Sequence, residues 1–174
     1  MQRDKAALEY AGETQVARAL ALLEPLVERV FLSVRPDQRD DPARAGTAHV
    51  VDRIADAGPI GGIEAALAAH PGAAWLVLAC DLPFLDVATL QQLIAGRAPQ
   101  RLATAFASSH DGKPEPLCAI YEPASSGAIS AWIGAGQRCP RSFLAQHDVA
   151  LLDLRNPQAL DNINTVDGGT LRST

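Results

Sequence analysis

The stretch Trp75–Phe84, WLVLACDLPF, decides the fold. Its first five residues form a continuous apolar run, which is typical of a parallel strand that helices cover on both faces. The run ends close to one carboxylate, Asp81, which directly precedes Leu82 and the chain-turning Pro83. Open α/β sheets bind ligands just outside the carboxyl ends of their strands, so Asp81 is expected at a ligand-binding edge. A carboxylate there can hold Mg²⁺, which takes one or two protein carboxylates and otherwise phosphate oxygens and water.

A helix cap is the competing explanation for an acidic residue at this point of the chain. Asp81 and Asp86 both precede a helical apolar pattern that begins at Val87, and aspartate is a preferred N-cap residue. We predict that Asp86 is an N-cap. Because Asp81 is pinned between the strand and Pro83, a functional role is favoured there.

Outside this stretch, helical patterns alternate with short apolar runs, which indicates an α/β protein with a parallel sheet. We predict a helix that Thr14 caps and that ends or bends near Pro25. A polar loop is expected at 35–46, a second loop at 110–116, and only a short glycine-broken tail after residue 165. The predicted strands cover 29–34, 49–51, 75–79, 101–107, 117–121 and 149–154, and further helices follow Gly62 and cover 87–95, 124–133 and 140–146.

Composition excludes several classes of protein. A chain of 174 residues suits a single domain, 1–174, with a sizeable core. Its net charge of −5 argues against a broad nucleic-acid-binding surface but permits a small anionic substrate. No apolar run approaches the length of a membrane span, and no secretory leader is recognisable, so we expect a cytoplasmic protein without membrane contact. Three distant cysteines predict neither a disulfide framework nor a zinc site, and Cys80 and Cys118 are expected to be small buried residues.

Five separated segments carry a resemblance to a known family. In order along the chain they resemble the motifs of molybdenum cofactor guanylyltransferase, which joins GMP from GTP to molybdopterin. The segments are DKA with LEY at 4–10, GPIGGI at 58–63, CDLPF at 80–84, EPLCAIY at 115–121 and NINT at 162–165. The resemblance implies a doubly wound, mostly parallel, Rossmann-like nucleotidyltransferase fold. It also implies Mg²⁺ as cofactor, GTP and molybdopterin as substrates, and transient contact with molybdoenzymes or other cofactor-synthesis proteins.

The resemblance also assigns residues. Lys5 and Asp81 would be catalytic, with Lys5 offsetting phosphate charge as pyrophosphate leaves and Asp81 holding Mg²⁺. Contacts to the second substrate would come from Arg138, Arg141, Asn162 and Asn164. The nucleotide would meet Lys5, Arg35, Asp52, Gly58, Pro59, Gly61, Gly62 and Asp81.

Each assignment has a plain structural alternative. Lys5 can be an ordinary surface lysine, and the Gly58–Gly62 segment can be a tight strand-to-helix turn rather than a backbone cradle for phosphate. Asn162 and Asn164 can stabilise a turn through their own backbone. The arginines at 138 and 141 can belong to a solvated helix start rather than grip a phosphate with their forked donors.

The sequence departs from the family pattern at four places. Ser33 stands where the family has the asparagine of an NxR-like motif that ends at Arg35, Glu115 replaces a histidine, and 166–168 replace a Pro-Glu pair. At the front, 1–5 align with the end of the family's first strand and glycine-rich loop. We therefore expect two exposed strand edges, and about 15 further residues before Met1 in the natural protein.

Two other functions fit the same residues. One is a related nucleotidyltransferase that uses CTP or a sugar phosphate, because base choice depends largely on the front loop. The other is a catalytically inactive nucleotide-binding module. Magnesium-dependent release of pyrophosphate from GTP separates an enzyme from a binding module.

Overall fold

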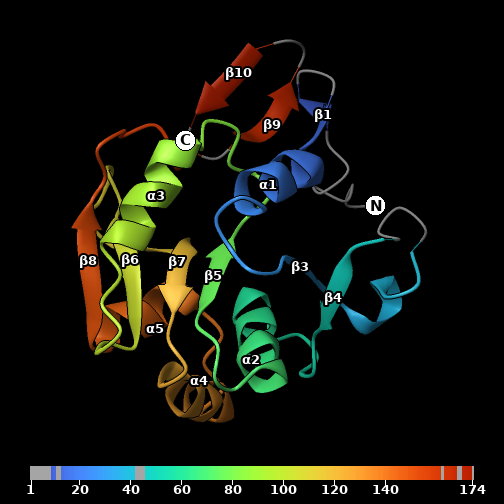
Figure 1. Cartoon of the computed structure of the whole chain (residues 1–174), viewed down its shortest axis with the longest axis vertical. Helices are drawn as coiled ribbons and strands as arrows, with labels where there is room; N and C mark the ends of the chain where they lie inside the picture. Colours follow the sequence, from blue (N-terminus) through green and yellow to red (C-terminus); the bar gives the residue numbers. More distant parts are fainter. Residues whose placement is uncertain (1–8, 11–12, 42–45, 162, 168–169, 174) are drawn as a thin grey trace.

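A four-stranded sheet lies at the centre of the computed structural model, in the strand order β5-β7-β6-β8 (Figure 1). The structure describes residues 9–10, 13–41, 46–161, 163–167 and 170–173. β7 runs antiparallel to both of its neighbours, whereas β6 and β8 are parallel. Three of the four strands therefore share one direction, which confirms the mostly parallel α/β fold. The strands are β5 (Trp75–Leu78), β6 (Ala103–Ala107), β7 (Pro114–Tyr121) and β8 (Val149–Asp153).

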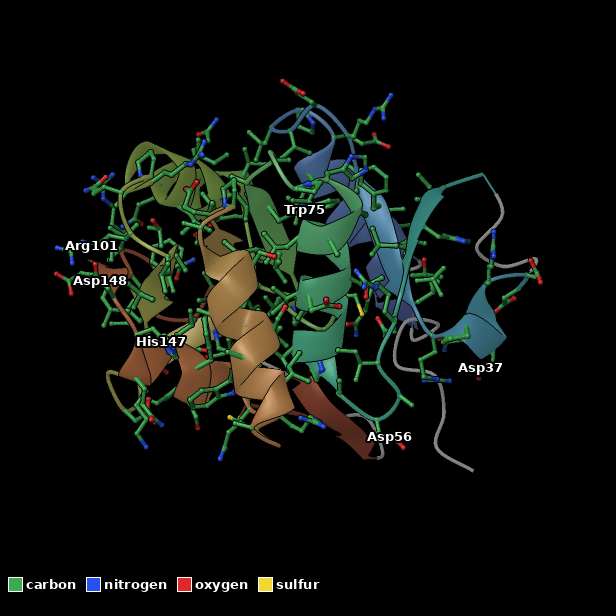
Figure 2. The ribbon with its side chains drawn as sticks, turned by 90° about the horizontal axis from the view of Figure 1, so that it is seen from below. Asp37, Asp56, Trp75, Arg101, His147 and Asp148 are labelled. Atoms are coloured by element: carbon green, nitrogen blue, oxygen red, sulfur yellow. The ribbon has the colours of Figure 1, made fainter. Side chains whose placement is uncertain are left out.

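Helices cover both faces of this sheet, which explains the unbroken apolar run of β5. Trp75 and Val77 pack into one core with three helices, and Leu76 and Leu78 pack into a second core with the other two. The first core contains residues of α2 (Pro59–Ala69), α4 (Ser125–Gly134) and α5 (Pro140–Gln146). Figure 2 shows α2 and α4 side by side on this face. The second core contains residues of α3 (Val87–Ala95) and apolar residues at the end of α1 (Gln15–Leu23).

A second, two-stranded parallel sheet is formed by β3 (Phe31–Val34) and β4 (Ala48–Val51). β3 and β5 begin side by side, because the rings of Phe31 and Trp75 are 5.3 Å apart and both lie near His70 at the end of α2. At its other end, Gly62 in the first turn of α2 lies against Ser33 and Asp52, so the carboxyl ends of β3 and β4 lie toward the amino-terminal end of α2.

β3 and β5 nevertheless belong to separate sheets within the described part of the chain. Among the described strands, β3 pairs with β4 and β5 pairs with β7. A cavity of about 720 Å³ lies between the starts of these strands and is lined by residues that include Leu26, Phe31, Trp75 and Arg97.

Two segments differ from the sequence-based expectation. β7 begins at Pro114, so part of the predicted loop at 110–116 is strand. The pairing of β6 with β7 changes register between Ala105 and Ala107, and such a bulge tolerates the missing N–H groups of Pro114 and Pro116. The predicted tail contains β9 (Ile163–Asp167) and β10 (Thr170–Ser173), which pair antiparallel.

Three short elements complete the described chain. β1 (Glu9–Tyr10) and β2 (Glu13–Thr14) form an antiparallel pair before α1, and the single-turn helix η2 (Pro36–Gln38) follows β3. None of the described helices is long and apolar enough to cross a membrane. Cys118 is buried, as predicted, and Cys80 is half-buried.

Side-chain caps fix the starts of two helices. The hydroxyl of Thr14 accepts the backbone N–H of Ala17 at 3.2 Å, and α1 ends at Leu23, just before Pro25. The carboxylate of Asp86 accepts the N–H of Thr89 at 2.7 Å, which confirms the predicted N-cap of α3. This N–H lowers the pKa of Asp86 below the ordinary value for aspartate.

Replacing Asp86 by alanine is expected to lower the free energy of unfolding by about 1 kcal/mol at neutral pH, the usual contribution of an N-cap. Because the pKa of Asp86 is lowered in the folded state, the charge-dependent part of this stabilisation is present above the ordinary aspartate pKa. It is lost as the pH falls through the folded-state pKa. Urea unfolding of the unchanged chain and of Asp86→Ala, at neutral and at strongly acidic pH, measures the difference in the free energy of unfolding. A difference in stability that grows toward acid would contradict the assignment.

Candidate active site

The first part of the site lies where β3 and β4 end against the start of α2. Asp52 directly follows β4, and its backbone N–H donates to the carbonyl of Val34 at 2.9 Å. The Ser33 hydroxyl donates to Asp52 Oδ1 at 3.3 Å. Burial raises the pKa of Asp52, whereas the Ser33 hydroxyl and the positive charge of Arg35 act in the opposite direction. The structure thus brings Arg35 and Asp52 together, two of the predicted nucleotide contacts.

The GPIGGI segment is not a loop that precedes a helix, because most of it belongs to α2 itself. Gly61 and Gly62 lie inside the first turn of α2, and only Gly58 precedes it, as the N-cap with φ of 64°. A Cβ on Gly62 would collide with the Ser33 hydroxyl, and one on Gly61 would lie 2.7 Å from the Ala57 Cβ. Gly62 allows α2 to approach the end of β3 closely, and Gly61 leaves room for Ala57 in the segment before the helix. Pro59 is the first helical residue and has no N–H to offer a phosphate.

Arg35 lies at the outer side of this part of the site. Its guanidinium pairs with Asp37, with Nε 3.1 Å from Oδ1 and Nη2 3.2 Å from Oδ2. Both side chains are exposed, and Figure 2 shows Asp37 at the periphery of the molecule. Such an exposed pair contributes little to stability.

The second part of the site is a pocket of about 180 Å³ at the end of β5. Three elements deliver its charged residues. Asp81 follows β5, Glu115 lies in the first residues of β7, and Arg141 lies in the first turn of α5. Because β7 is antiparallel to β5, its beginning reaches the edge where β5 ends. Apolar walls come from Ala79, Leu82, Pro116, Leu117, Cys118 and Leu160.

Arg141 is held by two carboxylates from different segments. Its Nη2 lies 2.8 Å from Glu115 Oε2, and its Nη1 lies 3.4 Å from Asp111 Oδ2. The backbone N–H of Lys113, more than the charges of Arg141 and Lys113, lowers the pKa of Asp111. Burial raises the pKa of the Cys118 thiol to about 12, and the nearby charge of Glu115 adds to this. Cys118 is therefore a protonated wall residue rather than a nucleophile.

Of the remaining predicted site residues, Arg138 has a described side chain, and it does not line this pocket. Arg138 donates to the carbonyls of Ile133 at 2.7 Å and Gln137 at 2.9 Å, and so caps the end of α4. Asn164 lies in β9, whose side chains the structure does not describe. Lys5 and Asn162 lie outside the described residues.

The acidic side chains of the pocket are too few to form a metal cage from protein ligands alone. Among the described residues, no group of three or more His, Cys, Asp or Glu side chains gathers as a complete metal cage. Asp81 and Glu115 line the same pocket, however, and Mg²⁺ needs only one or two protein carboxylates beside phosphate oxygens and water. Asp81, which follows β5, is the residue that the sequence predicts as the ligand.

Comparison with models of known protein families shows to which family this chain belongs. Residues 1–151 match the model of the MobA-like NTP transferase domain. The chain belongs to this family. The name of the family gives the class of substrate, a nucleoside triphosphate.

Several curated proteins are similar to this chain over most of its length. A molybdenum cofactor guanylyltransferase of Pseudomonas paraeruginosa is 32% identical over 169 residues, which cover 94% of this chain and 82% of the relative. A probable molybdenum cofactor guanylyltransferase of Opitutus terrae is 37% identical over 149 residues, which cover 83% and 71% of the two chains. A molybdenum cofactor biosynthesis bifunctional protein of Synechocystis is 33% identical over 165 residues; the match covers 95% of this chain but only 48% of that protein.

A solved structure supports the fold. The molybdopterin-guanine dinucleotide biosynthesis protein A of Archaeoglobus fulgidus superposes with a TM-score of 0.76 at 22% identity, and the match covers 92% of this chain and 84% of that one. At this identity, the likeness confirms the doubly wound α/β architecture alone.

Two of the carboxylates around Arg141, Glu115 and Asp111, were not predicted as site residues from the sequence. Glu115 was noted only as a departure from the family pattern, and Asp111 was not singled out. Their contacts with Arg141 join positions 26 and 30 residues apart in the chain. The only local signal for Asp111 in the sequence was the neighbouring Gly112, which favours a turn. The structure has this turn, and Gly112 has φ of 68°.

Proposed function

We propose that this chain transfers GMP from GTP to molybdopterin and releases pyrophosphate. The observation that carries the proposal is the pocket that holds Asp81 and Arg141 at the carboxyl edge of the sheet in a MobA-like NTP transferase domain. The names of the relatives from Pseudomonas and Opitutus support guanylyl transfer as the specific reaction.

In the proposed reaction, a terminal phosphate oxygen of molybdopterin attacks the α-phosphorus of GTP. A bond forms there while the bond from the α-phosphorus to the bridging oxygen breaks, and pyrophosphate leaves. Phosphoryl and nucleotidyl transfers of this kind depend mainly on positioning and on stabilisation of charge. Bound Mg²⁺, with Asp81 as its protein ligand, would supply the positive charge against the phosphates.

The protein's own residues divide between the two substrates. We assign the GTP nucleoside to the region of the Ser33–Asp52 contact and the start of α2, with Arg35 at its outer side. Arg141 would receive the phosphate of molybdopterin through its forked donors. Lys5, Asn162 and Asn164 keep their predicted contacts to phosphates and pterin as part of the proposal. We place the reaction in the cytoplasm, where the product would pass to molybdoenzymes.

The full chain should be incubated with molybdopterin, Mg²⁺ and, in parallel, GTP, CTP or ATP. We expect equimolar pyrophosphate and a guanine dinucleotide of the pterin with GTP, detected by mass spectrometry, and loss of both products when a chelator removes Mg²⁺. A preference for CTP would instead assign the chain to a cytidylyl reaction. GTP binding without release of pyrophosphate would leave a binding module and contradict the proposal.

A further inference from the structure

Arg141 has two carboxylate partners that differ in strength and setting. Glu115 belongs to strand β7, its side chain is 19% exposed, and its oxygen lies 2.8 Å from Nη2. Asp111 belongs to the turn before β7, its side chain is 38% exposed, and its oxygen lies 3.4 Å from Nη1. At 3.4 Å the second contact is long for a charge-assisted hydrogen bond, so Glu115 is the firm partner and Asp111 the weak one.

Asp111 also keeps other partners that do not involve Arg141. Its Oδ1 accepts the backbone N–H of Lys113 at 3.1 Å, and its Oδ2 lies 3.6 Å from the Lys113 ammonium. The lowered pKa of Asp111 has this backbone N–H as its largest cause, ahead of the charge of Arg141. The carboxylate would therefore stay ionised and stabilised if it lost Arg141.

A guanidinium presents five donors in a rigid fork, so it can keep one carboxylate and still bind a second oxyanion. An entering phosphate has two possible carboxylates to displace. The weaker, more exposed contact costs less to break, because exposed ion pairs contribute little to stability.

From this asymmetry we propose that Asp111 is an exchangeable counterion of Arg141. A phosphate monoester takes the place of Asp111 on Nη1, while Glu115 keeps Nη2 and holds the guanidinium over the pocket with Asp81. Glu115 and Asp111 are positioning residues in this scheme, because both act through Arg141. The identity of the phosphate as that of the pterin rests on the proposed function, whereas the exchange itself does not.

The test uses inorganic phosphate as the probe. The Nε–H resonance of Arg141, assigned by its loss in Arg141→Lys, is followed by NMR while phosphate is titrated into the full chain at constant ionic strength. Asp111→Asn keeps an oxygen for the Lys113 N–H but removes the competing charge. We expect phosphate to bind Asp111→Asn about two- to fivefold more tightly than the unchanged chain, which corresponds to the contribution of one exposed ion pair.

Asp148→Asn is the matched control. Asp148 also pairs with an arginine, Arg101, at an exposed position, and Figure 2 shows this pair together at the edge of the molecule. The control removes one negative charge from an aspartate–arginine pair without touching Arg141, so phosphate affinity at Arg141 should not change.

The outcomes separate the exchange from the proposed reaction. Equal phosphate affinities in Asp111→Asn and Asp148→Asn, or weaker binding in Asp111→Asn, would overturn the exchange even if the chain turns over GTP. Tighter phosphate binding in Asp111→Asn but not in Asp148→Asn would support the exchange. If the chain then shows no guanylyl transfer, only the proposed function fails.

Discussion

Replacing Asp81 by asparagine is expected to lower the rate of guanylyl transfer at least about 100-fold, a loss typical of removing one electrostatic contact to the transition state. Asparagine has nearly the same shape but lacks the charge that would hold Mg²⁺ against the phosphates. Asp81 lies after β5 in the wall of a pocket rather than in the core, so the thermal unfolding midpoint should stay close to that of the unchanged chain. Pyrophosphate release under saturating GTP and molybdopterin measures the rate.

Asp86→Asn is a closely matched control for this experiment. It removes a carboxylate only five residues further along, but asparagine is as good an N-cap as aspartate, so α3 should stay intact. We expect nearly full activity in this variant. Full activity in Asp81→Asn would show that Asp81 does not hold the metal or the phosphates.

Replacing Arg97 by methionine is expected to lower the free energy of unfolding by about 3 kcal/mol. The Glu122 carboxylate is only 3% exposed, and both of its oxygens accept from the Arg97 guanidinium, at 2.6 and 2.8 Å. Methionine keeps the apolar stem but leaves a buried charge without its cation. The expected cost lies at the lower end of the range for buried pairs, because Arg97 itself is 41% exposed. Urea unfolding at neutral pH measures the difference.

Two further variants isolate the cause of this loss. Arg97→Met combined with Glu122→Gln removes the buried charge and should recover part of the stability. Arg101→Met breaks the exposed pair with Asp148, and we expect a change below about 1 kcal/mol. If Arg97→Met costs no more than Arg101→Met, the ion pair is not a stabilising contact of the core.

The most predictable elements were those with strong local signals. α3 and α5 have the predicted bounds, Val87–Ala95 and Pro140–Gln146, because an aspartate cap and a first-turn proline mark their starts. β5 was predictable because two helical layers bury both of its faces. The early start of β7 was not, since its first residues are strand only through pairing with β6 across a bulge. The pairing of β9 with β10 was not predicted either, although the Asp-Gly-Gly sequence at 167–169 is a hairpin signal.

The candidate site was predictable to a similar degree. The position of Asp81 at the sheet edge follows from the strand that precedes it, and the structure adds Arg141 to the same pocket. The contacts of Arg141 with Glu115 and Asp111 depend on how α5 packs on β7, which no local pattern reveals. The glycines at 61 and 62 also serve close packing, because Gly62 leaves room for Ser33 and Gly61 for Ala57, and no local pattern reveals these contacts.

The fate of labelled GTP tests the central claim, transfer of a nucleotidyl group to a phosphate acceptor, most directly. The full chain would be incubated with molybdopterin, Mg²⁺ and GTP that carries a radioactive label at either the α- or the γ-phosphorus. The account predicts that the α-label enters the pterin product and that the γ-label leaves in pyrophosphate. Appearance of the γ-label in the pterin product, or as free inorganic phosphate with GDP, would contradict it.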